Sequence, residues 1–154
     1  MIRRTFIHVG LSGIALGALA TTGCQTTREA PSRRTEFRAR LGGASEVPAN
    51  RSQGKGEMEA TYDPASKELA WRLHYADLSG PATGAHFHGP AAAGANAGVV
   101  VPITGSVVGT WHRGEARLTD AQAADLMAGR WYVNVHTARF PGGEIRGQVL
   151  PDGR

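Results

Sequence analysis

The sequence predicts an all-β domain, an antiparallel sandwich or barrel of short strands with one short helix at about residues 119–128. Apolar and polar residues alternate with a period of two through most of the chain after residue 56. Gly, Pro, Asp and Ser residues interrupt these runs about every ten residues, as the turns of such folds do. A single capping-box sequence breaks the pattern and indicates the helix.

The runs 57–62 and 69–76 are the first strands that the alternation predicts. Each run places apolar side chains at every second position, so that one face of the strand is apolar and the other polar. Asp63 and Pro64 form the turn between them. The apolar side chains that these strands direct to the core are Met58, Ala60, Tyr62, Leu69, Trp71, Leu73 and Tyr75.

The helix is indicated by its two ends. Thr119 and Gln122 have the spacing of a capping box, and Gly129 is a typical residue to end a helix. We expect Leu126 and Met127 to cover an open end of the sandwich, and we assign no chemistry to this segment.

Two further strands follow the helix, at residues 131–137 and 145–149. Both continue the alternation, with Trp131 beginning the first of them. We expect this tryptophan to lie in the core together with Trp71 and Trp111.

Residues 1–23 have the features of an export signal. The segment contains Arg3 and Arg4, no acidic residue, and an apolar Gly- and Ala-rich run at residues 9–20. This run is shorter than the about 20 residues of a membrane-spanning helix. The arginine pair is typical of the twin-arginine pathway, which carries folded proteins, and an ordinary secretory signal is the alternative.

Cys24 ends a sequence similar to a bacterial lipobox, although Thr21 stands where an aliphatic residue is preferred. It is the only cysteine, so it cannot form an internal disulfide, and lipidation explains its presence in an exported protein. Gln25 then favours sorting to the outer membrane. Residues 24–35 form a polar tether to the domain at residues 36–154. We therefore expect a membrane-anchored lipoprotein that faces the periplasm or the outer surface.

The positive charge of the chain belongs to its N-terminal part. Five of the 17 Lys and Arg residues precede residue 36, but only one of the 13 Asp and Glu residues does, which leaves 12 of each sign in the domain. A neutral domain offers no basic surface for nucleic acid. Residues 36–154 have the length of one ordinary domain, which we expect to be a monomer.

The most informative motifs are 84–90 (GAHFHGP) and 132–137 (YVNVHT). His86 and His88 are two apart on a predicted strand and point to the same face, while Phe87 points into the core. His136 follows two valines and faces away from them. Three imidazoles form a usual donor set for Zn or Cu, which requires that they meet within about 4 Å of one point. The alternative is that each histidine only makes structural hydrogen bonds.

Neighbouring polar residues are candidates for supporting this site. Asn134 shares a face with His136 and is expected to contact a ligand, and Glu46 is expected to accept an imidazole N–H or to pair with Arg146. Glu144 and Arg146 are interpreted as a cross-strand charge set. The remaining candidate ligands are His112, interpreted as a solvent-facing strand residue, and His74, interpreted as a surface residue.

With these motifs placed, most of residues 37–151 resembles the CHRD (chordin) domain family. The resemblance rests on 41–48 (LGGASEVP), on 84–90, and on 131–137 followed by 140–148 (FPGGEIRGQ). It implies an immunoglobulin-like or related Greek-key β-sandwich that occurs in secreted animal proteins and in exported bacterial ones. It implies a fold more than a function.

A fainter similarity links His86, His88 and His136 to the copper ligands of Cu,Zn superoxide dismutases. The bridging histidine, the zinc-site cluster and the paired cysteines of those enzymes are not found. We therefore predict an exported lipoprotein that binds copper, or zinc, through three histidines, and we favour a binding protein over an enzyme. The alternatives are a metal-free envelope module for a protein or glycan partner and, less favoured, a dismutase-like redox enzyme.

Overall fold

The computed structural model describes residues 34–104 and 111–153. The expected export signal, Cys24 and all of the tether before residue 34 lie outside the described residues, and these expectations stay predictions. Within the described part, no helix has the length and apolar character needed to cross a membrane.

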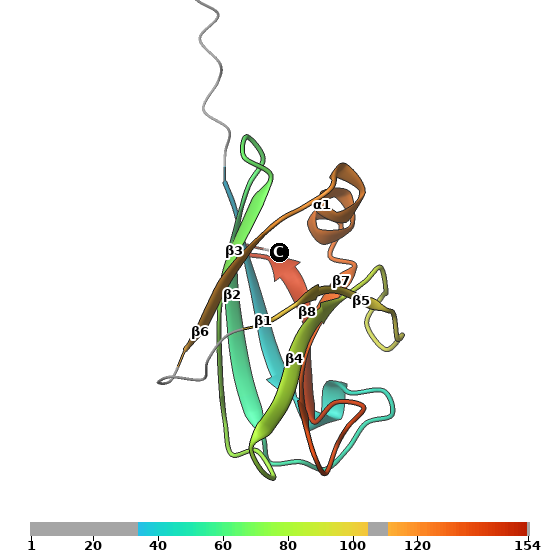
Figure 1. Cartoon of the computed structure of the whole chain (residues 1–154). Coiled ribbons are helices and arrows are strands. Elements are labelled where there is room, and N and C mark those ends of the chain that lie inside the picture. Colours follow the sequence, from blue (N-terminus) through green and yellow to red (C-terminus); the bar gives the residue numbers. More distant parts are fainter. Residues whose placement is uncertain (1–33, 105–110, 154) are drawn as a thin grey trace, which may run out of the picture.

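Eight strands and one α-helix form the domain (Figure 1). The first strand begins at Thr35, the last residue that we assign to the tether from the sequence. A 3-10 turn, η1 (Gly43–Ser45), follows it. The strands are β1 (Thr35–Gly42), β2 (Lys55–Asp63), β3 (Glu68–Ala76), β4 (Ala82–His88), β5 (Val99–Pro102), β6 (His112–Arg117), β7 (Trp131–Thr137) and β8 (Ile145–Pro151), with α1 (Asp120–Met127) between β6 and β7.

All eight strands belong to one antiparallel sheet with the order β5-β4-β7-β8-β1-β2-β3-β6. Figure 1 shows this sheet curling so that β2, β3 and β6 face β4 and β5. The ring of Trp71 on β3 contacts the ring of Phe87 on β4, with 5.2 Å between their centroids. The all-β prediction is therefore confirmed, while its finer description as a Greek-key sandwich stays a prediction.

The core lies between the two facing halves and includes most of the side chains that the alternation predicts, although Tyr75 is only partly buried. It also includes residues of β1 and β5, two strands that were not predicted from the sequence. Along β2 and β3 every second residue is buried, and Trp131 is also fully buried. Trp111 corrects the expectation for the tryptophans, because it lies half-buried outside the core with its ring 4.7 Å from the Arg72 guanidinium carbon. The residues of the neighbouring edge strand β6 alternate between half-buried and exposed. This edge therefore has no fully buried face that could take up the Trp111 ring.

The helix α1 is confirmed with the ends that the sequence predicts. Thr119 and Gln122 form both hydrogen bonds of the capping box, and Gly129 has a positive φ of 70° just beyond the last turn. Leu126 is fully buried in the core, as expected. Met127 is 39% exposed, so the expectation that it covers the open end is wrong. One residue further along a helix is rotated by about 100°, which directs it to solvent.

The outer face of β7 is buried as well as its inner face, which alternation alone does not predict. Tyr132 and Asn134 point away from the core and are still buried. Two segments cover this face: residues 43–54 and residues 89–98, called here the covering loops. They are joined to each other by a hydrogen bond from Asn96 Nδ2 to the Val47 carbonyl. The covering loops and the outer face of β4, β7 and β8 enclose the candidate site.

Candidate metal centre

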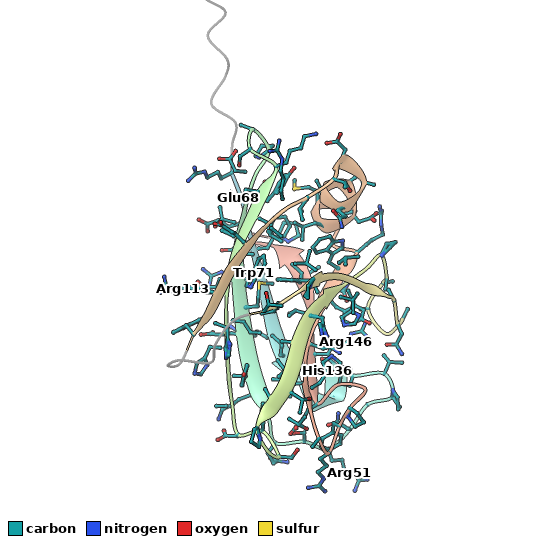
Figure 2. The ribbon with its side chains drawn as sticks, viewed as in Figure 1. Arg51, Glu68, Trp71, Arg113, His136 and Arg146 are labelled. Atoms are coloured by element: carbon teal, nitrogen blue, oxygen red, sulfur yellow. The ribbon has the colours of Figure 1, made fainter. Side chains whose placement is uncertain are left out.

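Three histidines meet on the outer face of β4 and β7. One ring nitrogen from each of His86, His88 and His136 lies within 4.8 Å of the other two. Because no two of these nitrogens are more than 4.8 Å apart, one point lies within about 2.8 Å of all three. The convergence expected from the sequence is therefore confirmed. Figure 2 shows His136 on this half of the molecule, away from Arg113 on β6.

The pairing of β4 with β7 brings the histidines together. Gly84 lies opposite His136 and His86 lies opposite Asn134, so the three imidazoles occupy neighbouring positions on one face. Phe87 lies between the two β4 histidines and is fully buried on the other face. Because Gly84 has no side chain, nothing separates the His136 ring from the His86 ring, and their centroids are 4.9 Å apart.

Backbone carbonyls fix the orientation of two of the three rings. His88 Nδ1 is 3.0 Å from the Ala97 carbonyl oxygen, and His136 Nδ1 is 3.0 Å from the Pro141 carbonyl oxygen. A carbonyl only accepts, so each Nδ1 carries a proton and each Nε2 of a neutral ring has a free lone pair. Metal-binding histidines are commonly held in this way, with the second ring nitrogen donating to a carbonyl.

The inward nitrogens are then close to one another without full hydrogen-bonding partners. His86 Nδ1 lies 3.0 Å from His136 Nε2 and donates its proton to it. His88 Nε2 lies 3.0 Å from Asn134 Oδ1, and in a neutral His88 both of these atoms are acceptors. Of the three rings, His88 is the one whose inward lone pair meets no donor, and a cation at the centre of the cluster would satisfy it. The cation would also replace the His86 proton on His136 Nε2, with His86 then protonated at Nε2 instead of Nδ1.

The environment keeps the β4 imidazoles neutral. Burial, and then the nearby His136 and His88, lower the pKa of His86 from its usual value. Burial also lowers the pKa of His88, and this effect outweighs the hydrogen bonds that the ring makes to Ala97 and Asn134. Neutral imidazoles are the form that binds metal.

Glu46 and Asn134 lie behind His88, and the expectation that Asn134 contacts one of the three histidines is confirmed. Asn134 contacts His88 rather than His136. Glu46 is hydrogen-bonded to Asn134 instead of to an imidazole, and its Oε1 is buried without a hydrogen-bond partner. Burial raises the pKa of Glu46 to about 7, against the effects of the Arg146 charge and of the hydrogen bonds from Val47 and Asn134.

Arg146 and Tyr132 are the residues of this region whose role the sequence did not indicate. The Tyr132 ring stacks on His88 at 4.7 Å between centroids and 2° between planes. The Arg146 guanidinium carbon is 3.4 Å from the centre of the same ring. Arg146 also donates to Asn96 Oδ1 and to the Ala95 carbonyl, which ties the second covering loop over the site. Their period-two placement on the outer faces of β7 and β8 was the only available signal.

The expected charge set of Glu144 and Arg146 is wrong. Glu144 is fully buried and accepts hydrogen bonds from Ser52, Ser79 and Thr137, whereas Arg146 is bonded to the second covering loop. The two residues are two apart, but Glu144 lies in the bend before β8 begins at Ile145, so the rule that alternate strand residues share a face does not apply to it. Burial alone would raise the pKa of Glu144, but these hydrogen bonds lower it below its usual value.

The other two candidate histidines lie away from the cluster. His74 is half-buried beside Trp111, with 5.4 Å between the ring centroids. His112 is also half-buried and stacks on Tyr75 at 4.8 Å. Neither belongs to the group of possible ligands in the described residues. The cluster therefore consists of three nitrogen donors with no carboxylate among them.

Comparison with known proteins identifies the family of this domain. Curated proteins and solved structures give no significant match. A family model described as the CHRD domain matches residues 37–149. The matched residues run from β1 to β8 and include the three histidines, both covering loops and Arg146. The chain therefore belongs to the CHRD domain family.

Proposed function

We propose that this chain is an exported, membrane-anchored CHRD-domain protein that binds a transition metal through His86, His88 and His136. The observation that carries the proposal is the meeting of three ring nitrogens within 4.8 Å, with two of the rings held by backbone carbonyls. A tetrahedral metal with bonds of about 2.0–2.1 Å holds its nitrogens about 3.3 Å apart. His86 and His136 are only half-buried, so their rings have space for the small movement inward.

Copper is the favoured metal and zinc the second. A site of nitrogen donors binds divalent copper more tightly than divalent zinc, and imidazole is a suitable ligand for both. The three histidines leave coordination positions for water or another small ligand. A handling or redox-protective role in the cell envelope is consistent with such a site.

The metal proposal is tested by titrating the purified domain with copper and zinc. Wild-type protein is expected to bind one ion, and His86→Ala/His136→Ala is expected to lose at least 100-fold in affinity because two of three ligands are gone. His74→Ala/His112→Ala is the matched control, since it also removes two half-buried histidines but none of the cluster. Equal affinity in the wild type and the cluster variant would overturn the proposal. Binding is also expected to weaken below about pH 6, because the imidazoles must be neutral.

Membrane anchoring is proposed from the lipobox-like sequence that ends at Cys24. Acyl chains contribute about 0.8 kcal/mol per buried methylene group, so a multiply acylated cysteine holds a protein at a membrane. Cys24→Ser is expected to move the protein from the membrane fraction to the soluble fraction of the envelope. Unchanged partitioning of the variant would contradict a lipid anchor.

A metal-free interaction module is the second candidate, and a hollow between three loops favours it. The hollow has a volume of about 280 Å³ and is lined by Arg51, Arg139 and Phe140 among others. The two arginines are exposed and make no ion pair with any described residue. Such a surface fits an acidic glycan or an acidic protein segment. Partner binding that survives His86→Ala/His136→Ala but is lost in Arg51→Ala/Arg139→Ala would support this candidate over the metal site.

A further inference from the structure

We infer that the buried Arg146 guanidinium, which lies behind one of the ligands, shifts the copper preference of the three-histidine site toward the monovalent ion, Cu(I), and away from Cu(II). This inference rests on the proposed metal binding and names the form of the ion. It follows from the geometry of three stacked groups, from the charge of the donor set, and from the burial of Arg146.

The Tyr132 ring lies between Arg146 and His88. In the sheet, β7 has β4 on one side and β8 on the other, and Tyr132 lies directly opposite His88 on β4. Arg146 reaches the ring from β8, with its guanidinium carbon 3.4 Å from the ring centre. Since the two groups come from opposite neighbouring strands and both lie over the ring, they occupy its two faces. The order of the stack is therefore Arg146, Tyr132, His88.

The positive charge of Arg146 is permanent and weakly screened. The guanidinium is always protonated, and the residue is only 2% exposed. Its hydrogen bonds go to the Asn96 side-chain oxygen and the Ala95 carbonyl, which are neutral acceptors. Charge interactions across a protein interior are several times stronger than in water. The cluster therefore experiences a positive potential from the side of His88.

The three ligands carry no negative charge that would balance this positive potential. All three donors are imidazoles, so a bound ion keeps its full formal charge, and a divalent ion meets twice the repulsion of a monovalent one. Imidazole donors without a carboxylate suit copper in either state, so the donors themselves do not exclude Cu(I). The charge of Arg146 therefore shifts the balance between the two copper states toward the lower one.

One carboxylate near the cluster opposes the positive potential of Arg146. Glu46 is hydrogen-bonded to Asn134, which contacts His88. Its negative charge, when present, opposes that of Arg146. The other buried carboxylate among the described residues, Glu144, is engaged by hydroxyl and backbone donors of Ser52, Ser79 and Thr137. Arg146 and Glu46 are thus two charges of opposite sign behind the same ligand.

Because Arg146 and Glu46 carry opposite charges, their removal is expected to shift the Cu(I)-to-Cu(II) affinity ratio in opposite directions. The affinities of the wild-type domain for Cu(I) and Cu(II) are measured by competition with a colorimetric chelator for each ion, without oxygen in the Cu(I) series. Arg146→Met is expected to lower the Cu(I)-to-Cu(II) affinity ratio by about tenfold, the size expected for one unit charge about 10 Å away at an effective dielectric of about 20. Glu46→Gln is expected to raise the ratio. A tenfold change equals a shift of about 59 mV in the one-electron potential of the bound copper.

Two controls separate charge from packing. Gln148→Leu removes the hydrogen bonds from Gln148 to the Ala91 and Gly129 carbonyls without changing charge, and Arg113→Met removes an exposed arginine on β6. Both are expected to leave the ratio unchanged. Ratios that move in the same direction for Arg146→Met and Glu46→Gln, or that do not move, would overturn the inference. If Arg146→Met does not fold, an unchanged or lower ratio in Glu46→Gln overturns it. Failure of wild-type protein to bind either ion would instead overturn the proposed function.

Discussion

At the scale of single residues, Glu144 shows how this protein keeps a charge in its interior. The carboxylate accepts hydrogen bonds from the hydroxyl groups of Ser52, Ser79 and Thr137 at 2.6–2.7 Å and from the Ser79 backbone N–H at 2.7 Å. It makes no ion pair with any described residue. Hydrogen bonds to a charged group are worth more than neutral ones, so four of them compensate for its burial.

Glu144→Gln is expected to lower the free energy of unfolding by about 1–3 kcal/mol at pH 7, because the amide N–H₂ group would face hydrogen-bond donors. The pKa of Glu144 is lower in the folded state than in the unfolded state. The carboxylate therefore stabilises the fold above the unfolded pKa of about 4.3, and this contribution is lost as pH falls through the folded pKa. Denaturant unfolding at pH 7 and pH 3 should show the difference between wild type and variant shrinking at pH 3.

The exposed Glu115→Gln on β6 is the control, and it is expected to leave the unfolding free energy unchanged within about 0.5 kcal/mol. A difference for Glu144→Gln that is equal at both pH values would contradict the role given to its charge.

Residue patterns in the sequence predicted the three candidate ligands but not the atoms that orient them. His86, His88 and His136 could be found because side chains two apart on a strand share a face. The carbonyls of Ala97 and Pro141 carry no sequence signal, because every residue has one. Arg146 and Glu144 were interpreted as a cross-strand charge set, whereas the structure directs the two side chains to different partners.

At the scale of elements, β8 lies unusually close to β1. A Cβ atom on Gly147 would lie 2.4 Å from the Arg40 carbonyl oxygen, which is closer than any side chain permits. Gly42, which lies opposite Arg146 at the other end of this pairing, has no atom within 4 Å of its own virtual Cβ. The absence of a side chain at Gly147 is therefore what lets β1 and β8 approach.

Gly147→Ala is expected to destabilise the fold by about 1–3 kcal/mol, because the backbone of β1 has to move to admit the methyl group. Gly42→Ala is expected to change the unfolding free energy by less than about 0.5 kcal/mol. Thermal or denaturant unfolding of the two variants measures the contrast. Equal effects of the two substitutions would show that the close approach of β1 and β8 does not contribute to stability.

The positions of β2, β3, β7 and β8 were predictable because period-two alternation is a local property of the sequence, whereas β1 and β5 were not predicted. The covering loops were not predicted either, since turn residues such as Gly and Pro predict an exposed connection. Residues 89–98 instead bury Tyr132 and His88 through hydrogen bonds to backbone groups. Alternation therefore predicts one buried face for β7, whereas both of its faces are buried in the structure.

At the scale of the whole molecule, Phe87 connects the core to the site. Its ring contacts Trp71 across the core and Trp131 on β7, at centroid distances of 5.2 and 6.0 Å. The residues on either side of it are His86 and His88, the two β4 histidines of the candidate site. The packing that joins the two halves of the sheet is therefore the packing that fixes the position of two imidazoles.

Phe87→Ala is expected to cost about 3–5 kcal/mol of unfolding free energy, because a fully buried ring leaves a cavity. Copper affinity is expected to fall with it, since β4 loses the contact that holds it. Phe87→Leu, which preserves most of the volume, is expected to cost less than Phe87→Ala and to retain copper binding. Unfolding curves and copper titrations of both variants provide the test. Full copper affinity in a destabilised Phe87→Ala would show that copper binding does not depend on the core contacts of Phe87.

The fold class could be predicted from the sequence, but the pairing of strands could not. Alternation identifies a strand without naming its neighbour. β4 pairs with β7, whose His136 lies 50 residues after His86, and no local pattern reports that contact. The curling of one sheet into two facing halves likewise depends on contacts such as that of Trp71 with Phe87.

Because β4 pairs with β7, the three-histidine site can form only after β7 has been synthesised. His86 and His88 leave the ribosome about fifty residues before His136, and β8, which holds Arg146 behind Tyr132, is made later still. During synthesis the first two histidines are therefore no more than an ordinary pair of side chains on an unpaired strand. Under the proposed function the folded domain acquires the copper, and the side of the membrane on which an exported domain folds decides which pool of copper it meets.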